Sequence, residues 1–391
     1  MIKIGRETII SFLPGLSIYI HWPFCQAKCP YCDFNSHVKK SINQEEWTKA
    51  YISNLNFWAK KTSQNRISTI FFGGGTPSLM SEKTVNEILE TIFYLWNCQS
   101  NLEISLEANP TSVETKKFKA FKNSGINRLS MGIQALNDQD LKRLGRLHTA
   151  RDAQKAFDIA SESFNRVSFD LIYGRQHQKL KDWETELLGA LKMSIGHLSL
   201  YQLTIEENTR FGELLLKEKL KGLPADESSI DFYNLTNEIC ESENLPAYEI
   251  SNHAKKGDEC RHNLNYWRGG AFLGVGPGAH GRLNIRNKRY LTEAPSNPDL
   301  WLKLVKEQKF ESFTSKHMSN NEQGNEYIIM GLRLKEGFNI DHYYNLTQRR
   351  LPMTKLSELQ DQNLIQINEQ MLKTTKSGKL LTDYVIRQLL C

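Results

Sequence analysis

The sequence lacks an apolar stretch near the roughly 20 residues that a membrane-spanning helix needs. It has seven cysteines in 391 residues, and four of them are scattered as Cys98, Cys240, Cys260 and Cys391. Such an odd, dispersed set does not suggest a disulfide framework and is typical of a reducing compartment. Long basic runs are also absent, because the net charge of +6 comes from interspersed charges of both signs. We therefore expect no membrane span and no nucleic-acid-binding arm.

The amino-terminal segment imitates a secretion signal only in part. Lys3 and Arg6 precede the apolar run 9–13, but Pro14 and Gly15 interrupt that run. No cleavage site of small residues follows. The sequence therefore predicts a cytoplasmic protein without a secretion signal.

The first 210 residues alternate between β-rich and helix-like segments. The β-rich segments are 16–21, 67–72, 102–107, 128–134, 166–173 and 197–204. Apolar residues recur at helical spacing in the first two intervening segments, as Trp47, Tyr51, Leu55 and Trp58, then Val85, Ile88, Leu89, Ile92 and Trp96. Repeated strand–helix units imply parallel strands with right-handed crossovers. The sequence predicts an α/β fold, a partial (β/α)6 TIM-like barrel, with a doubly wound sheet as the alternative.

The rest of the chain has a different character. Residues 205–300 are predicted to be loop-rich, and they include a glycine cluster at 269–281. The last 70 residues read as helix, then two short strands near 364–367 and 371–374, then helix. This order predicts a small α+β domain that resembles a winged helix. We divide the chain into a core domain with its extension, 1–300, and a C-terminal domain, 301–391.

The strongest chemical signal is the segment Cys25-Gln-Ala-Lys-Cys29-Pro-Tyr-Cys32, directly after the first predicted strand. Three thiolates on one short loop can hold three irons of a 4Fe-4S cluster and leave the fourth iron open to a ligand. The alternatives are a zinc site completed by His21 or His37, and three unrelated thiols. Zinc usually prefers paired C-x2-C segments, so the spacing favours the cluster.

The second signal is the run Gly73-Gly74-Gly75-Thr76-Pro77 after the second predicted strand. Consecutive glycines let the backbone approach a ligand at a strand's carboxyl end, although a tight turn explains them equally well. Further polar positions fall at or near the ends of later strands: Glu107, Gln134 and the region after Asp170. Parallel strands bring such ends to one rim, where barrel enzymes place their sites.

The cysteine segment, with Tyr19 before it and Tyr31 within it, resembles the core of the radical S-adenosylmethionine (SAM) superfamily. The glycine run resembles that superfamily's glycine motif. Further segments are similar to the oxygen-independent coproporphyrinogen III oxidase (HemN-like) group: Ser105-Leu-Glu107-Ala-Asn-Pro110, Arg128-Leu-Ser-Met-Gly-Ile-Gln134, Leu144-Gly-Arg146 and Asp170-Leu-Ile-Tyr-Gly174. The resemblance covers almost the whole chain.

Within that group, two features resemble the haem chaperones, HemW, more than the HemN oxidases. The oxidases carry a further cysteine two positions after the third ligand, where this chain has Phe34. The segment His262-Asn-Leu-Asn-Tyr266-Trp267 matches the H-N-x-x-Y-W signature of the chaperones. One departure is Arg175-Gln-His-Gln178, where the family usually has Leu-Pro-Gly-Gln, so the conformation of this loop is open.

The resemblance implies that Cys25, Cys29 and Cys32 hold a 4Fe-4S cluster whose open iron is chelated by SAM. It also implies SAM contacts for a set of residues at the rim: Tyr19, Tyr31, Gly74, Gly75, Thr76, Glu107, Gln134, Arg146 and Asp170. Backbone groups of Gly75 and Thr76 would bind the methionine end. Glu107 and Arg146 would be its polar partners, and Gln134 and Asp170 would hold the ribose.

For haem, His262 is the candidate axial ligand, and Tyr266 and Trp267 are candidates to stack on the porphyrin. His253 and His280 are the alternative ligands. One hypothesis is a chaperone that delivers haem to haemoproteins, with SAM and the cluster tuning transfer or homodimer formation. A second is an oxidase that decarboxylates coproporphyrinogen III by radical chemistry. A third is a zinc-stabilised α/β protein without a redox role.

Overall fold

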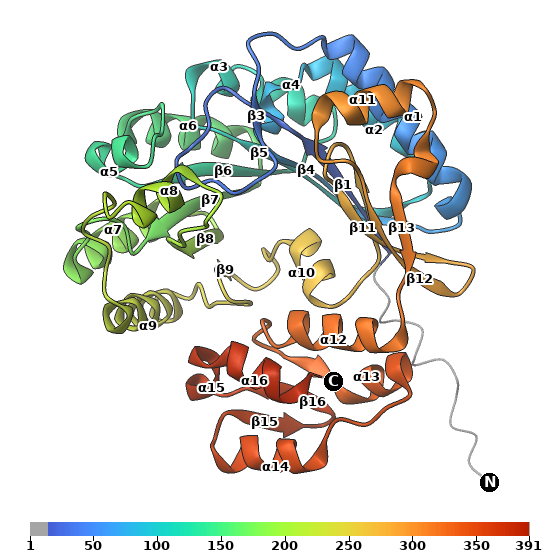
Figure 1. Cartoon of the computed structure of the whole chain (residues 1–391). Coiled ribbons are helices and arrows are strands. Elements are labelled where there is room, and N and C mark those ends of the chain that lie inside the picture. The colour runs from blue at the N-terminus through green and yellow to red at the C-terminus, as the bar shows by residue number, and fades with distance from the viewer. Residues whose placement is uncertain (1–14, 391) are drawn as a thin grey trace.

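The computed structural model describes residues 15–390, and its larger part is a curved eleven-stranded sheet with helices on the outside (Figure 1). Six parallel strands form the middle in sequence order: β1 (Leu16–Trp22), β4 (Ile67–Gly74), β5 (Cys98–Ala108), β6 (Arg128–Gln134), β7 (Arg166–Tyr173) and β8 (His197–Gln202). Each predicted strand is present, two of them with the predicted bounds. The predicted α/β partial barrel is confirmed.

The outer helices bury the apolar faces that their sequences predict. They are α1 (Gln44–Thr62), α2 (Glu82–Leu95), α3 (Ser112–Thr115), α4 (Phe118–Asn123), α5 (Asp138–Arg143), α6 (Ala150–Ser163) and α7 (Leu180–Met193). Trp47, Tyr51 and Leu55 of α1 are buried against the sheet. Ser81 caps α2, because its Oγ accepts a hydrogen bond from the backbone N–H of Thr84 at 3.0 Å.

The sheet extends beyond both sides of these six strands. β9 (Asn252–Ala254) pairs with β8, while β10 (Phe272–Val275) lies parallel to β1 and continues through β11 (His280–Ile285), β12 (Lys288–Glu293) and β13 (Thr314–His317). Three helices accompany these strands: α8 (Arg210–Leu216), α9 (Asp226–Ser242) and α10 (Arg261–Trp267). The loop-rich prediction for 205–300 is therefore only partly right, because three helices and several short strands occupy this region. Strands of three to six residues give too few alternations to be recognised.

The smaller C-terminal part has its own core, in which Ile328, Leu372 and Val385 are fully buried. Its helices are α12 (Asn320–Gly331), α13 (Ile340–Thr347), α14 (Met353–Asp361), α15 (Lys376–Leu380) and α16 (Thr382–Leu389), around the sheet β14 (Phe338–Asn339), β16 (Met371–Thr374) and β15 (Ile365–Asn368). By contrast, Trp301 of α11 (Pro298–Lys306) stacks on Trp47 of α1, with ring centroids 5.4 Å apart. The boundary between the two cores therefore lies after β13, later in the chain than the predicted division at 300/301.

The C-terminal part lies across the open side of the curved sheet, next to α10 (Figure 1). Arg268 donates to both carboxylate oxygens of Glu336 at 2.8 and 3.2 Å, and Arg282 pairs with Glu326 at 2.7 Å. No helix among the described residues is long and apolar enough to cross a membrane. Residues 1–14, where no secretion signal is expected, and Cys391 lie outside the described part.

Candidate functional site

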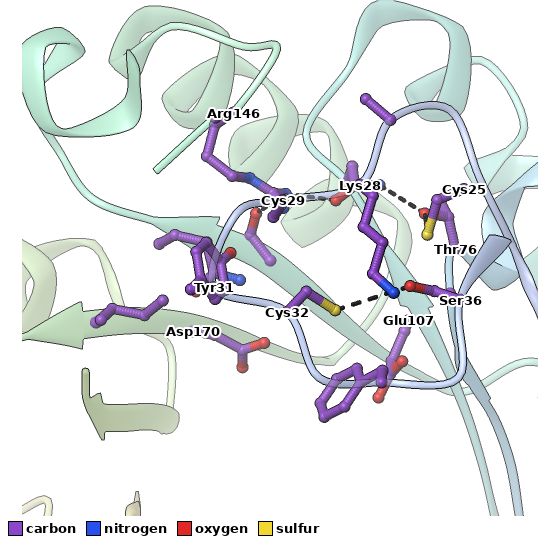
Figure 2. Close-up of a pocket in the computed structure, with 18 of the residues that line it drawn as sticks. Cys25, Lys28, Cys29, Tyr31, Cys32, Ser36, Thr76, Glu107, Arg146 and Asp170 are labelled. Atoms are coloured by element: carbon purple, nitrogen blue, oxygen red, sulfur yellow. Dashed lines mark hydrogen bonds between the residues drawn. The ribbon is translucent and has the colours of Figure 1, made fainter. Parts of the chain in front are cut away.

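The cysteine loop is held at its two ends by a small ladder of strands. β2 (Phe24–Cys25) pairs in parallel with β3 (His37–Val38), so the chain leaves the barrel rim and returns to it. The Asn35 side chain donates to the carbonyl oxygens of Pro277 and Ser296 at 3.0 and 2.9 Å. These contacts give the loop a defined position above the carboxyl ends of the strands (Figure 2).

The glycine run packs directly against this loop. The backbone N–H of Gly75 donates to the Trp22 carbonyl at 2.7 Å, and that of Thr76 donates to the Phe24 carbonyl at 2.9 Å. A Cβ atom on Gly75 would lie 2.7 Å from the Phe24 oxygen and 3.0 Å from Cys25 Sγ, so only glycine permits this approach. Both N–H groups are already bonded, and the Thr76 carbonyl accepts from the Leu79 N–H at 3.0 Å, which leaves the Gly75 carbonyl for a ligand.

A cavity of about 420 Å³ lies between the cysteine loop and the strand ends, and we call it the mouth cavity. It brings together all but one of the rim residues that the resemblance implies. They are Cys25, Cys29, Tyr31, Cys32, Gly74, Gly75, Thr76, Glu107, Gln134, Arg146 and Asp170. Figure 2 shows the cysteines on the loop, with Glu107 and Asp170 on strands beneath them.

A chain of hydrogen bonds links two of the cysteines through polar side chains. Thr76 Oγ1 donates to Cys25 Sγ at 3.5 Å, and Asn109 Nδ2 donates to Thr76 Oγ1 at 3.1 Å. Arg146 then donates to Asn109 Oδ1 at 2.5 Å and to Cys29 Sγ at 3.3 Å. Sequence reasoning missed Asn109, although it stands in the Glu107-Ala-Asn-Pro110 segment, because its position beside Thr76 depends on two separate strands.

Two carboxyl groups in the mouth cavity have strongly perturbed acidities. Burial, with a contribution from the neighbouring Asp170 charge, raises the pKa of Glu107 to about 8. Burial also raises the pKa of Asp170 to about 6. The Glu107 carboxylate accepts a hydrogen bond from the Gly74 N–H at 3.2 Å. Two poorly solvated carboxyls in one cavity favour a cationic or hydrogen-bond-donating ligand.

The two tyrosines implied at the rim lie in different places. The Tyr31 ring lines the mouth cavity and contacts Phe211 of α8, with centroids 6.5 Å apart. Tyr19 instead lines a second cavity of about 210 Å³ deeper in the barrel, which we call the inner chamber. Its hydroxyl lies 3.1 Å from Nδ1 of His21. The inner chamber shares Glu107, Ser130, Asp170 and Tyr201 with the mouth cavity, so a contact of Tyr19 with SAM stays a prediction.

His262 lies in the barrel interior, where the predicted role of axial haem ligand does not fit. Its Nδ1 lies 2.7 Å from Thr69 Oγ1 and its Nε2 2.6 Å from the Tyr266 hydroxyl, so both ring nitrogens are already hydrogen-bonded. Burial lowers the pKa of His262 to about 3. The adjoining inner chamber is smaller than the roughly 300–1,000 Å³ of typical ligand pockets. His262 and Tyr266 line this chamber, whereas Trp267 is half-buried on α10.

The two alternative histidines also lie away from the mouth cavity. His253 is buried on β9, and burial lowers its pKa to about 4. His280 begins β11, and 57% of its side chain is exposed. Of the three histidines named for haem, only His280 is accessible in this structure.

The metal chemistry of the cysteine loop fits a cluster better than zinc. Within residues 15–390, no three Cys, His, Asp or Glu side chains are gathered closely enough to hold one metal ion. Both ring nitrogens of His21 have hydrogen-bond partners, with Nε2 2.9 Å from the Asn35 carbonyl and Nδ1 3.1 Å from the Tyr19 hydroxyl, so His21 is not free to complete a zinc site. A 4Fe-4S cluster binds each thiolate through a different iron, so its ligands need not meet at one point. Three soft donors bordering one cavity suit that arrangement.

Comparisons with known proteins agree with this site. Residues 19–187 match the radical SAM superfamily, and residues 318–381 match the HemN C-terminal domain. The chain is 41% identical to the heme chaperone HemW of Haemophilus influenzae over 70% of this chain and 72% of that protein. It is 34% identical to HemW of Bacillus subtilis over 94% of this chain and 97% of that protein.

The structural comparison extends the likeness of fold to nearly the whole chain. The structure of coproporphyrinogen III oxidase (HemN) from Escherichia coli is similar with a TM-score of 0.81. It covers 96% of this chain and 90% of its own, at 19% identity, so it bears on the fold alone. The family itself rests on the sequence relatives above: the chain belongs to the HemW family of radical SAM proteins.

Proposed function

We propose that this protein is a haem chaperone of the HemW type. It holds a 4Fe-4S cluster on Cys25, Cys29 and Cys32, binds SAM in the mouth cavity, and carries haem to a recipient haemoprotein. The observation that carries the proposal is the mouth cavity, where the three thiols face Glu107 and Asp170. Membership of the chain in the HemW family supports the chaperone rather than the oxidase. Phe34 supports it too, because the oxidases have a further cysteine at this position.

The residues of the mouth cavity divide the binding of SAM between its two ends. The Gly75 carbonyl oxygen accepts from the ammonium group, and the Thr76 carbonyl, which already accepts from the Leu79 N–H, offers its second lone pair. Arg146 faces the carboxylate, while Gln134 and Asp170 hold the ribose. The positive charge of the ligand favours the ionised form of Glu107, whose raised pKa otherwise keeps it protonated, and the carboxylate then balances that charge. When bound, the cluster and SAM supply one-electron chemistry at the sulfonium carbon–sulfur bond.

The haem-binding surface is proposed at the rim of the mouth cavity rather than in the interior. Three large side chains at this rim are unusually exposed: Phe34 by 58%, Leu147 by 66% and Tyr201 by 40%. An apolar rim of this kind can contact the flat face of a porphyrin. His262 is fully enclosed, so haem ligation by His262 would first require α10 to leave the barrel interior.

Haem titration of single variants tests this placement. We expect His262→Ala to bind haem as tightly as the wild type, since its ring is enclosed. Phe34→Ser should weaken binding several-fold, because it removes apolar contact area at the rim. A His262→Ala variant that folds normally but no longer binds haem would reverse this assignment. Leu216→Ser is the matched control, since Leu216 is 80% exposed on α8 and does not line the cavity.

An anaerobic assay separates the chaperone from the oxidase. The reconstituted protein is incubated with SAM, an electron donor and coproporphyrinogen III, and separately with haem and an apo-haemoprotein. We expect stable haem uptake and transfer, without protoporphyrinogen. Formation of protoporphyrinogen at more than a stoichiometric amount would replace the chaperone proposal by the oxidase. The variant Cys29→Ala, which removes one cluster ligand, reports any cluster-independent background.

A further inference from the structure

The Arg175-Gln-His-Gln178 loop, which departs from the family pattern, contains a buried arginine. The Arg175 side chain is 3% exposed and forms ion pairs with Asp140 of α5, at 2.9 Å, and with Glu186 of α7. It also donates to the carbonyl of Ile172 at 2.8 Å. The leucine that the family usually has at this position could make none of these polar contacts.

These contacts also give the loop a defined turn without the usual Pro-Gly pair. The Arg175 N–H donates to the Gln178 side-chain oxygen at 3.2 Å, and the Gln178 N–H donates back to the Arg175 carbonyl at 3.1 Å. His177 takes a left-handed conformation, with φ of +61°, and its N–H donates to the Gly222 carbonyl at 2.6 Å. The loop is therefore rebuilt around Arg175.

The same arginine reaches the end of β6, where the strand is irregular. The pairing with β7 shifts register between Met131 and Gln134, and Gln134 has φ of +77°, a conformation that non-glycine residues rarely adopt. Such a backbone persists only where its surroundings hold it. Here Arg175 Nη1 lies 3.4 Å from the Gln134 carbonyl, and Glu186 accepts from the Leu136 N–H at 2.6 Å.

Two further side chains complete the support of this strand end. Arg146 donates to the Gly132 carbonyl at 2.7 Å, and His148 Nε2 lies 3.0 Å from the Ile133 carbonyl. Three successive carbonyls, at residues 132, 133 and 134, are thus held by three different side chains. The Gln134 amide then lies over Gly132, where a Cβ atom would be only 2.9 Å from its Nε2. This places the amide in the mouth cavity beside Arg146.

We propose that Arg175 is a positioning residue for the nucleoside end of SAM, and that it acts through Gln134. The Arg175–Glu186 pair holds the backbone on both sides of Gln134, at the carbonyl of residue 134 and at the N–H of residue 136. Loss of the pair would free Gln134 to leave its left-handed conformation and turn its amide away from the ribose. The inference rests on the proposed binding of SAM in the mouth cavity.

Anaerobic calorimetric titration of the full-length, cluster-reconstituted protein tests the proposal. We expect Arg175→Met to weaken SAM binding at least tenfold, and Gln134→Ala to weaken it by a similar factor. The double variant should bind SAM no more weakly than Gln134→Ala alone, because both substitutions abolish the same contact, that of the Gln134 amide with the ribose. Arg175→Met should also weaken the binding of 5'-methylthioadenosine, which lacks the amino-acid end, by the same factor relative to the wild type. Arg175→Lys, which keeps a charge but not the planar fork, should fall between.

Arg282→Met is the matched control, since Arg282 also forms a largely buried ion pair but lies against the C-terminal part. It should leave SAM affinity unchanged. A wild type that does not bind SAM would refute the proposed function itself. If the wild type binds SAM and Arg175→Met binds it with the same affinity, the inference about Arg175 is overturned and the proposed function is not. The same holds if the two losses of affinity multiply in the double variant. If Arg175→Met does not retain its cluster, Glu186→Gln decides, and unchanged SAM affinity in that variant overturns the proposal.

Discussion

Two glutamates on β5 lie four residues apart on the same face of one strand, and the protein treats them in opposite ways. Glu103 accepts hydrogen bonds from Arg166 at 2.6 Å and from the backbone N–H of His262 at 3.0 Å. Burial opposes its charge, but Arg128 and Arg166 more than offset this and lower the pKa of Glu103. Glu107 has one hydrogen bond, from the Gly74 N–H, and its pKa is raised to about 8.

The difference separates a structural end of the barrel from a binding end. At the Glu103 end, α10 fills the interior and the carboxylate satisfies the N–H groups at the start of that helix. At the Glu107 end, an under-bonded carboxyl faces a cavity, which is typical of a site that awaits a ligand. The inner chamber, bordered by Glu107 and His262, lies between the two ends.

The largest effect that distinguishes the two ends concerns their cysteines. Cys29→Ala should abolish the cluster, because a thiolate of the mouth cavity is lost, and iron and sulfide analysis of anaerobic preparations measures this. Cys98→Ala is the matched change at the opposite end of β5, and it should retain the full iron content. Equal iron loss in both variants would mean that the cysteine loop is not the cluster site.

A smaller effect is expected when each carboxyl group is replaced by an amide. Glu103→Gln should lower the free energy of unfolding by about 3–5 kcal/mol, because it removes the nearer of the two carboxylates that pair with Arg166 and a negative charge beside the buried Arg128. Glu107→Gln should change stability little, yet weaken SAM binding at least tenfold. Urea unfolding and SAM titration measure the two quantities. The comparison fails if Glu107→Gln is the more destabilising change.

The pH dependence of stability gives the smallest and most specific contrast. The folded Glu107 keeps its proton up to a pKa of about 8, whereas the unfolded chain releases it near 4.5. This group therefore stabilises the fold at low pH, and its contribution is lost as pH rises toward 8. The slope is at most about 1.4 kcal/mol per pH unit, and water in the cavity reduces it. When unfolding is measured from pH 6 to 8, this slope should be lost in Glu107→Gln and kept in Gln360→Glu, an exposed change on α14.

The sequence was sufficient for the parallel strands and for most of the polar residues named at the mouth cavity, although it missed Asn109. Alternating apolar residues located β6 and β7 with their observed bounds, and parallel strands necessarily bring residues such as Glu107 and Asp170 to one rim. The predictions failed where a contact joins distant segments. His262 follows an easily recognised signature, but its enclosure depends on Thr69, 193 residues earlier in the chain.

Other features had no sequence signal of their own. The Arg166–Glu103 pair joins residues 63 positions apart, and no local pattern distinguishes Glu103 from Glu107. Likewise, Arg175 looked like a disruption of a turn, because the partners that make it useful lie on α5 and α7. Such pairings are set by tertiary packing, which single-sequence periodicity does not report.

The ladder between β2 and β3 has a consequence for how the protein matures. Its backbone pairing, together with the Asn35 anchors and the glycine contacts, shapes the cysteine loop by hydrogen bonds that involve no metal. Small zinc domains, by contrast, acquire their structure only when the ion arrives. We therefore expect iron and sulfide to be inserted into a loop whose backbone is already shaped by these hydrogen bonds.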